Sequence, residues 1–497
     1  MKKSTRAIAF LLVLMQLLLA ACSNTDAQKG NEVSGETTAA GESDTGSGQV
    51  YTGLDELDLE GYEFRIMTKS TSAEHCHHTE CFSVDEYVGE GVNDAVHDRE
   101  IALLDRYNFV VEPFNIDDWS TQFQQSVQAS DGNFDLGLQS TGPCSSVTLN
   151  GYTIPWNSLD NVDLTQPWWN QSAMDSLSVK DIVCYTTGDI SYETIAFTYC
   201  MFFNKELCEN WGISADSLYQ AVEDGKWTIS YLYSLTKDIY EDTDGDGNRT
   251  FEDLYGFTTN SLSGQAIYQI STDTLLTRKD ANDMPYIIED TEKLASLVEK
   301  MYILMYQNEG TFPVTKGYNT SDKGTQDWWA MTSYKLLHHT TLLTSGLFYE
   351  LYHEYTEKDF DIGVLPLPKY DTAQKNYMTT ADYHGTLAVI PTSANMQFTG
   401  FCATALAAYG RELITPAYYE TALKSRYADT ERDAEMIELT MQGLTYDMYS
   451  VYTTSSVLQS IIYDKSYDFS SYWAKSQKSI NKSFDKIIDT FEGYIGE

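Results

Sequence analysis

The sequence predicts an α/β protein built of two lobes. Strand-like and helix-like segments alternate from residue 62 to residue 138, which is typical of a parallel sheet with helices packed on it. The segment with the composition of a folded protein, residues 54–497, is too long for one hydrophobic core. Alternation and length together therefore predict the fold class.

Residues 1–22 have the composition of a lipoprotein export signal. Lys2, Lys3 and Arg6 precede the apolar run 7–18, and Leu-Ala-Ala-Cys ends the segment at Cys22. A lipoprotein peptidase needs small residues before a cysteine whose thiol takes the diacylglycerol. We expect lipidated Cys22 to anchor the protein to the outer face of a membrane; an ordinary signal with an incidental Cys22 is the alternative.

Residues 23–53 are predicted to be a disordered tether. Residues 23–49 are mostly Ser, Thr, Gly, Ala, Glu and Asp without an aromatic side chain, so they bury too little apolar surface to offset the cost of ordering. Beyond Cys22, no segment reaches the eighteen apolar residues that a membrane-spanning helix needs.

The chain is strongly acidic. Loss of the signal leaves 29 of the 32 Lys and Arg residues against all 73 Asp and Glu residues, a net charge of −44. Such a surface repels phosphate backbones and anionic lipid headgroups. We therefore expect no nucleic-acid partner.

The N-terminal elements alternate regularly. The predicted elements are the strand 62–67, the helix 91–106, the strand 109–114, the helix 119–129 and the strand 134–138. Ligands of parallel sheets lie beyond the carboxyl ends of the strands. Ser140 and Thr141 follow the third strand directly, so they are candidate ligand contacts, with an ordinary turn as the alternative.

The stretch 188–207 contains an unbroken apolar run, residues 196–203, which is typical of a strand buried on both faces. Asn204 follows it as the cap of a short helix. The apolar run and its cap define a strand-to-helix unit near the middle of the chain.

This unit resembles the lobe-to-lobe crossover of the family 1 extracellular solute-binding proteins, the maltose-binding-like receptors of ABC importers. The resemblance is carried by Phe-Asn-Lys-Glu-Leu at 203–207 with Gly212 after it, by Pro-Trp-Trp at 167–169, and by Gly-Lys-Trp-Thr at 225–228. Adjacent indoles cannot share one side of a helix. One of Trp168 and Trp169 is therefore expected in a core, and the other is a candidate wall of the ligand cleft.

The resemblance implies a type 2 periplasmic-binding-protein-like fold with a hinge of three crossovers. These are expected at residues 196–198, 337–340 and 391–395, with a strand at 336–343 and closing strands of the first lobe at 361–369 and 387–391. The first lobe would hold residues 54–196 and 338–392, and the second lobe residues 197–337 and 393–497.

The resemblance also implies an extracytoplasmic monomer that captures a sugar or an oligosaccharide between the lobes and delivers it to ABC permease subunits. Aromatic faces stack on sugar rings while polar side chains take the hydroxyls. The expected ligand contacts are Ser140, Thr141, Tyr192, Glu193, Trp328, Trp329, Tyr383, His384, Tyr446 and Tyr449. Peptides and other polar solutes are alternative ligands.

Two other classes of function stay open on the residues alone. A secreted carbohydrate-active enzyme with paired carboxylates would also be acidic and rich in Tyr and Trp, and a non-transport ligand sensor would share the fold. Against an enzyme, the sequence contains no Gly-x-Ser-x-Gly, His-Glu-x-x-His or phosphate loop. We expect no catalytic residue.

Residues 242–253 read DTDGDGNRTFED. Acids at positions 1, 3, 5 and 12 with glycine at 6 match the spacing of an EF-hand-type loop, in which alternate side chains converge on one calcium ion. The expected ligands of a structural calcium ion are Asp242, Asp244, Asp246, Asn248 and Asp253. Arg249 at position 8 and Asp rather than Glu at position 12 depart from the pattern, and a plain acidic turn is the alternative.

Residues 75–81, His-Cys-His-His-Thr-Glu-Cys, hold ligands that zinc or copper prefers. Neighbouring residues on one loop rarely converge on one ion, so a loop between the first strand and the first helix is favoured. Cys76 and Cys81 are the pair close enough for a local bridge, and the other cysteines beyond Cys22 are expected to be buried thiols.

Overall fold

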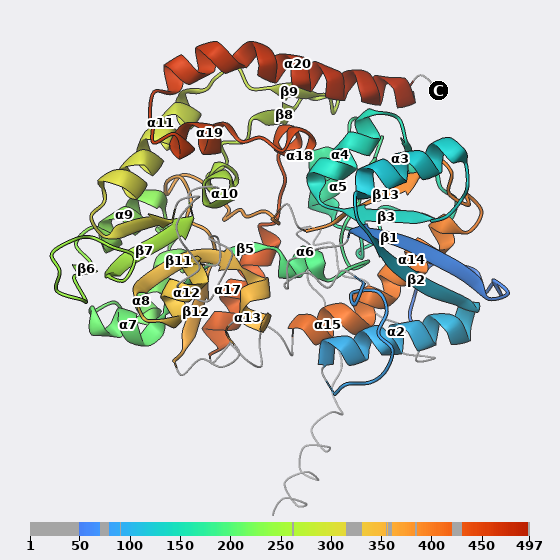
Figure 1. Cartoon of the computed structure of the whole chain (residues 1–497), viewed down its shortest axis with the longest axis horizontal. Coiled ribbons are helices and arrows are strands. Elements are labelled where there is room, and N and C mark those ends of the chain that lie inside the picture. Colours follow the sequence, from blue (N-terminus) through green and yellow to red (C-terminus); the bar gives the residue numbers. More distant parts are fainter. Residues whose placement is uncertain are drawn as a thin grey trace, which may run out of the picture. The chain divides into compact units, whose positions relative to one another are not determined.

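The computed structural model describes residues 49–69, 79–89, 91–260, 263–314, 331–353, 355, 360–382, 385–419 and 430–495. The chain from Val50 onward forms one compact unit, and its two mixed β-sheets are the centres of two lobes. The α/β class with two lobes is as predicted. Figure 1 shows the elements of both lobes.

The first sheet has the strand order β2-β1-β3-β13-β4. Its strands are β1 (Tyr62–Lys69), β2 (Phe109–Ile116), β3 (Leu136–Gln139), β4 (Thr153–Ile154) and β13 (Leu387–Pro391). β1 runs parallel to β2 and β3, as predicted, and β13 returns antiparallel beside β3. The helices of this lobe are α2 (Gly91–Tyr107), α3 (Trp119–Ala129), α4 (Thr141–Leu149), α5 (Gln171–Leu177), α14 (Thr399–Tyr409) and α15 (Thr415–Ala417). In Figure 1, α3 and α4 lie on one side of the sheet and α2 and α14 on the other.

The second sheet has the order β10-β7-β11-β5-β12, with β6 on β7. Its strands are β5 (Tyr199–Asn204), β6 (Tyr240–Glu241), β7 (Leu254–Asn260), β10 (Thr311–Val314), β11 (Thr341–Leu347) and β12 (Ile362–Leu365). β7 is parallel to β10 and β11, whereas β5 is antiparallel to β11 and β12. The helices of this lobe are α7 (Lys205–Asn210), α8 (Ala215–Glu223), α9 (Ile229–Thr236), α10 (Ser263–Ser271), α11 (Glu292–Tyr302), α12 (Met331–Leu337), α13 (Phe348–His353) and α17 (Glu431–Gln442).

The start of α7 confirms the predicted cap, and the start of α9 is capped in the same way. The Asn204 side chain accepts a hydrogen bond from the Leu207 amide at 2.8 Å, and the Thr228 hydroxyl accepts one from the Tyr231 amide at 3.1 Å. Each cap satisfies an amide that has no partner within its helix. β5 therefore passes directly into α7, as the apolar run followed by Asn204 predicts.

The chain passes between the lobes along three neighbouring segments, which we call the crossing ladder. They are residues 197–199 after α6 (Glu193–Ala196), residues 379–382 between β12 and β13, and residues 443–445 between α17 and α18. Backbone hydrogen bonds tie them together: the Tyr199 amide donates to the Thr380 carbonyl at 3.0 Å, and the Thr445 amide donates to the Thr379 carbonyl at 2.9 Å. The first of these segments overlaps the crossover expected at 196–198.

The other two predicted crossovers are wrong. Residues 337–340 join α12 to β11 within the second lobe, and residues 391–395 join β13 to α14 within the first. The predicted strand 336–343 begins only at Thr341, because His339, at a φ of 56°, turns the chain after α12. Two pairs of leucines around four polar residues suit a helix end as well as a strand.

The strands β11 and β12 also differ from the expectation, because both pair in the second sheet rather than in the first. By contrast, α14 packs into the apolar core of the first sheet, although the second lobe was expected from residue 393 onward. The sequence of a strand buried on both faces is a continuous apolar run. Such a run does not indicate which sheet the strand joins.

The C-terminal helices connect the lobes a second time. They are α18 (Met448–Thr453), α19 (Val457–Tyr463) and α20 (Phe469–Ile495). α18 packs on α4 of the first lobe, α19 packs on α10 and α11 of the second, and α20 contacts α4 as well as α11. One buried apolar cluster consequently contains side chains of both lobes. α20 also lies along a hairpin formed by β8 (Thr277–Lys279) and β9 (Pro285–Ile287).

Candidate functional site

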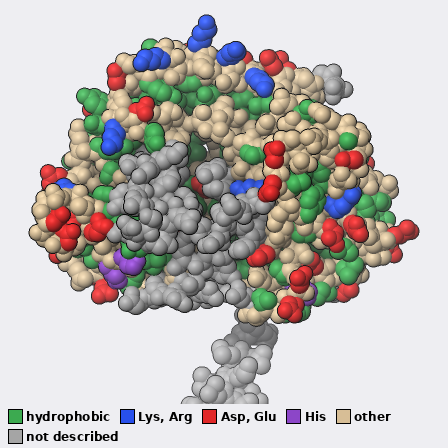
Figure 2. All heavy atoms as spheres, viewed as in Figure 1, with side chains coloured by type: hydrophobic (Ala, Val, Ile, Leu, Met, Phe, Trp, Pro, Cys, Tyr) green, Lys and Arg blue, Asp and Glu red, His purple; other side chains and the backbone are tan. Residues whose placement is uncertain are grey.

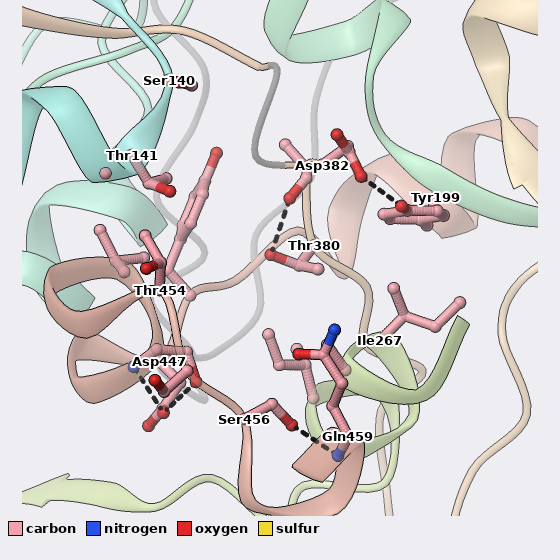
Figure 3. Close-up of a pocket in the computed structure, with 18 of the residues that line it drawn as sticks. Ser140, Thr141, Tyr199, Ile267, Thr380, Asp382, Asp447, Thr454, Ser456 and Gln459 are labelled. Atoms are coloured by element: carbon pink, nitrogen blue, oxygen red, sulfur yellow. Dashed lines mark hydrogen bonds between the residues drawn. The ribbon is translucent and has the colours of Figure 1, made fainter. Parts of the chain in front are cut away.

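A cavity of about 500 Å³ lies beside the crossing ladder. Its walls come from both lobes: α4 and the residue before it belong to the first, and β5 and α10 to the second. The second crossing and the segment from Tyr446 to Gln459 complete the lining (Figure 3). The cavity therefore takes residues from every part of the chain that meets between the sheets.

Part of the cavity wall is apolar. Tyr199, Ile267, Ile270, Tyr446 and Val451 line it, and all five are buried in the protein. Burial raises the pKa of the Tyr446 phenol well above its ordinary value, so this ring is neutral. Neutral aromatic and aliphatic faces of this kind suit the C–H faces of an organic ring.

Asp382 is the main charged group of the polar side. The Tyr199 hydroxyl donates a hydrogen bond to Asp382 Oδ2, as Figure 3 shows, and the Asp382 amide donates to the Phe197 carbonyl at 2.7 Å. Asp382 is thus held by the first crossing through both its side chain and its backbone. A group bound to this carboxylate would contact the crossing ladder directly.

The second carboxylate of the lining, Asp447, has a structural role. Its Oδ1 accepts from the Thr277 amide at 2.9 Å and the Thr277 hydroxyl at 2.5 Å. Its Oδ2 accepts from the Ser450 amide at 3.2 Å and the Ser450 hydroxyl at 2.8 Å, which caps α18. Four donors from the protein therefore satisfy Asp447, and it has little capacity for a ligand.

Hydroxyl and amide groups form the rest of the polar side. Figure 3 shows Thr141 on α4, Thr380 on the second crossing and the Gln459 amide facing the same space. Thr454, between α18 and α19, has a φ of 53°, which is unusual for a β-branched residue. It approaches α4 at Gly142, where a Cβ would lie 3.1 Å from the Thr454 methyl carbon.

The expected ligand contacts fall into three groups. Ser140, Thr141 and Tyr446 line the cavity. Tyr192, Glu193 and Tyr449 do not line the cavity. Trp328, Trp329, Tyr383 and His384 lie outside the described residues. Contact with a ligand stays a prediction for the first group.

Tyr192 and Glu193 support the first crossing rather than the cavity wall. The Tyr192 ring stacks on Tyr418 with centroids 5.2 Å apart, and the Thr386 hydroxyl donates to Glu193 Oε2 at 2.5 Å. Tyr449 is buried in the apolar cluster and does not line the cavity. The sequence placed these residues near the right segments, but it could not tell which way their side chains turn.

The Pro-Trp-Trp segment does not line the cavity beside the crossing ladder. Trp168 and Trp169 are 3% and 1% exposed, and both pack into the core of the first sheet. The expectation that one of the two indoles lines the cleft is therefore wrong. The segment is an irregular turn before α5 rather than a helix, so adjacent side chains can both turn inward.

Sequence reasoning missed Tyr199, Thr380, Asp382 and Gln459. Asp382 directly precedes the expected pair Tyr383 and His384, so proximity in the chain was an available indication. Tyr199 falls within the predicted apolar strand 196–203, so its side chain was expected in a core. The residues that converge here are far apart in the chain, and no local spacing connects them.

The acidic loop gathers three of its five expected ligands. Carboxylate oxygens of Asp242, Asp244 and Asp246 all lie within 4.8 Å of one another. Although the Asp246 amide lowers the pKa of Asp244, burial and the neighbouring carboxylates of Asp246 and Asp242 raise it above its ordinary value. Hard oxygen donors at this spacing fit a cation such as calcium.

The other two expected ligands serve the loop itself. Asn248 donates to Asp246 Oδ2 at 2.9 Å. Asp253 is fully buried, and its carboxylate accepts from the Thr243 amide at 3.1 Å and the Thr250 amide at 2.7 Å. Asp253 therefore does not stand in the place of a bidentate ligand at position 12.

The remaining expectations concern Cys22, the His-Cys loop, the other cysteines and membrane-spanning helices. Cys22 and residues 75–78 lie outside the described residues. Cys144, Cys184, Cys200, Cys208 and Cys402 are buried and unbridged, and burial raises the pKa of each thiol. None of the helices in the described segments is long and apolar enough to cross a membrane.

The fold is that of ABC transporter substrate-binding proteins, an α/β two-lobed periplasmic-binding-protein-like fold with two mixed sheets. An ABC substrate-binding protein of Listeria monocytogenes, solved in complex with cycloalternan, matches 86% of this chain and 99% of its own with a TM-score of 0.55 and 11% identity. A solute-binding protein of Thermotoga lettingae bound with α-D-tagatose matches 85% and 100% with a TM-score of 0.52 and 12% identity.

A cyclic α-maltosyl-1,6-maltose binding protein of Arthrobacter globiformis matches 87% of this chain and 99% of its own, with a TM-score of 0.51 and 12% identity. No protein-family model and no curated protein matches the sequence. The likeness is therefore one of fold, at identities too low to carry ligands over residue by residue.

Proposed function

We propose that the protein is the substrate-binding component of an ABC importer and that it captures a sugar or an oligosaccharide in the cavity beside the crossing ladder. The observation that carries the proposal is the position of Asp382, which lines the cavity and is bonded to both Tyr199 and Phe197 on the first crossing. A ligand held there is positioned to influence how the two lobes move.

The chemistry of the cavity supports a sugar. A volume of about 500 Å³ lies within the range of small-molecule sites. Apolar side chains such as Ile267 and Tyr446 line the cavity together with the hydroxyl of Thr380 and the carboxylate of Asp382, a combination that suits a ring with apolar faces and hydroxyl edges. The structural neighbours solved with cycloalternan and α-D-tagatose have the same fold.

A glycosidase is less well supported. Among the described lining residues, the two carboxylates are Asp382 and Asp447, and Asp447 is saturated by Thr277 and Ser450. Glycoside hydrolysis in most families needs two carboxyl groups that face the same bond. Because the protein already engages one of these two carboxylates fully, the described lining fits binding better than hydrolysis.

Delivery to a permease requires that the protein stay at the membrane. The Leu-Ala-Ala-Cys segment supports lipidation of Cys22, and the tether after it supports a mobile link to the folded chain. We infer an extracytoplasmic lipoprotein that acts as a monomer beside its permease subunits.

The acidic loop is proposed to hold a structural calcium ion through Asp242, Asp244 and Asp246. Its backbone is already organised, since the Gly245 and Gly247 amides donate to the Asp242 carboxylate at 2.8 and 2.9 Å. A bound cation would relieve the repulsion among the three carboxylates.

A thermal-shift screen against neutral mono- and oligosaccharides tests the proposed ligand class. A sugar at about a hundred times its Kd should stabilise the folded state by about 2.7 kcal/mol, and calorimetry then gives the affinity. Stabilisation by peptides and by no sugar would move the proposal to another solute, whereas turnover of a glycoside would replace it.

A further inference from the structure

A second groove, of about 810 Å³, lies between the hairpin β8–β9 and the helix α20. Residues 285–289 form one wall, and one face of α20 forms the other. This groove shares no lining residue with the cavity beside the crossing ladder. Whatever it binds is therefore independent of the proposed sugar site.

The strand β9 presents an outer edge to this groove. The Asp280 amide donates to the Met284 carbonyl at 2.9 Å, and the Ile288 amide donates to the Leu276 carbonyl at 3.0 Å. These bonds identify the hydrogen-bonded pairs of the hairpin. In an antiparallel ladder these pairs alternate, so the backbone groups of Ile287 point away from β8. Pro285 is the neighbouring residue whose backbone groups point outward. Its backbone nitrogen carries no proton, so it needs no hydrogen-bond acceptor on a neighbouring strand.

The floor of the groove is apolar. Tyr286 is 46% exposed, Ile287 and Ile288 are half-buried, and Phe484 and Ile488 of α20 face them. An open strand edge beside exposed apolar side chains is the kind of surface that proteins normally cover. The groove thus offers both backbone pairing and apolar contact.

The rim of the groove is acidic. Glu289, Asp485, Asp489 and Glu492 line it and are exposed, and no lining residue is Lys or Arg. The lysines of α20, at 475, 478, 482 and 486, are not among the lining residues. Figure 2 shows basic side chains along the outer side of α20 and apolar side chains directly below it. The lining of the groove itself therefore carries acidic side chains and no basic ones.

The hairpin is held firmly in place. The Lys180 amide donates to the Asp283 carbonyl at 3.2 Å, and Lys279 donates to the Ser178 hydroxyl at 3.0 Å, so the hairpin is tied to the first lobe. Arg278 pairs with Asp273 at 2.9 Å within the second lobe. A strand edge fixed in this way loses little conformational entropy when another strand pairs with it.

Charge decides what can occupy the groove. The chain's own tether, residues 23–49, has five acidic residues and one lysine, and a second copy of the chain has the same strongly acidic composition. Both would meet repulsion at the rim. We propose that the groove binds an extended, Lys- or Arg-rich segment of a partner protein, which pairs with β9 as an added strand and lays alternate apolar side chains against Phe484 and Ile488.

Fluorescence anisotropy of a labelled peptide of alternating Lys and Val, added to the full chain, tests this proposal. The peptide should bind, and Ile287→Pro should weaken binding ~tenfold by removing one outward N–H, whereas Ile287→Val should not. Asp489→Lys should lower the affinity for the peptide and reduce the dependence of that affinity on salt. The control is Asp238→Lys, at a side chain that is 86% exposed on the second lobe, and it should leave both quantities unchanged.

A second measurement guards against misfolding of the Ile287→Pro variant. A Lys-Val peptide with N-methylated amides on its pairing edge should fail to bind the unaltered protein, because it cannot donate to the Ile287 carbonyl. The proposal is overturned if the Lys-Val peptide does not bind, if a Glu-Val peptide binds equally well, or if the N-methylated peptide binds as well as the parent.

Discussion

At the scale of single residues, Asp382 links the cavity to the crossing ladder. Its carboxylate lines the cavity, and its backbone belongs to the second crossing. Asp447 lines the same cavity but is fully engaged by Thr277 and Ser450. Two aspartates in one cavity therefore have different tasks, and their substitutions should have different effects.

Asp382→Asn should weaken binding of the cognate sugar about 10- to 150-fold, because a hydrogen bond to a charged group contributes roughly 1.5–3 kcal/mol. Isothermal titration calorimetry measures the loss. Asp447→Ala should instead lower the melting temperature, since it removes the cap of α18. Equal affinities for the Asp382 variant and the unaltered protein would remove Asp382 from the site.

Two glycines provide a matched test of packing. A Cβ on Gly363 of β12 would lie 2.1 Å from ring atoms of fully buried Phe203, whereas a Cβ on Gly493 of α20 would meet nothing within 4 Å. Gly363→Ala should destabilise the protein by roughly 1–3 kcal/mol, and Gly493→Ala should stabilise it by about 0.5–1 kcal/mol. Urea denaturation measures both, and a neutral Gly363 variant would contradict the packing of β12 on β5.

How far the sequence predicts the site depends on local geometry. Ser140 and Thr141 were found because they follow a strand of a parallel sheet, where the chain must turn at the ligand edge. Tyr199 and Asp382 were missed because their meeting depends on the pairing of two distant crossings. The direction of a buried side chain such as Glu193 is likewise set by tertiary packing and not by its neighbours in the chain.

At the scale of elements, the sequence predicts the strands that alternate with helices. It does not predict which sheet a later strand joins. β1, β2 and β3 alternate with α2 and α3, so their parallel order follows from chain connectivity. β12 and β13 are both short apolar strands near a proline, yet one joins the second sheet and the other the first. Their destinations depend on partners that lie far away in the sequence.

The acidic loop gives a prediction at this scale. A chelator should lower the melting temperature, and added calcium should restore it, because an ion that binds only the folded state stabilises it by mass action. Asp244→Asn should abolish the response, whereas Asp238→Asn, just outside the loop, should preserve it. A melting curve indifferent to chelator and calcium alike would leave the loop as an acidic turn.

At the scale of the whole molecule, the lobes are joined by the crossing ladder and by the helices α18 to α20. Small-angle scattering should show a smaller radius of gyration with the cognate sugar, because closure brings the lobes together. The Asp382→Asn variant at the same sugar concentration is the control, and it should stay extended. Tight binding without compaction would mean that the C-terminal helices hold the lobes at a fixed angle.

The anchor can be tested in cells. Cys22→Ser should abolish lipid labelling and release the protein from the membrane fraction or leave it unprocessed, because serine has no thiol for the diacylglycerol. Replacement of Ser23, the next residue, by Ala should leave lipid labelling intact. Unchanged membrane retention of the Cys22 variant would show that another segment holds the protein there.

The position of β13 has a consequence for synthesis. β3 lies between β1 and β13, and β13 is made only after the strands of the second sheet have been synthesised. Until then, one side of β3 has no strand beside it, and the first sheet cannot be completed. We therefore expect the first sheet to stay incomplete until late in synthesis, a state that is compatible with the export predicted from residues 1–22.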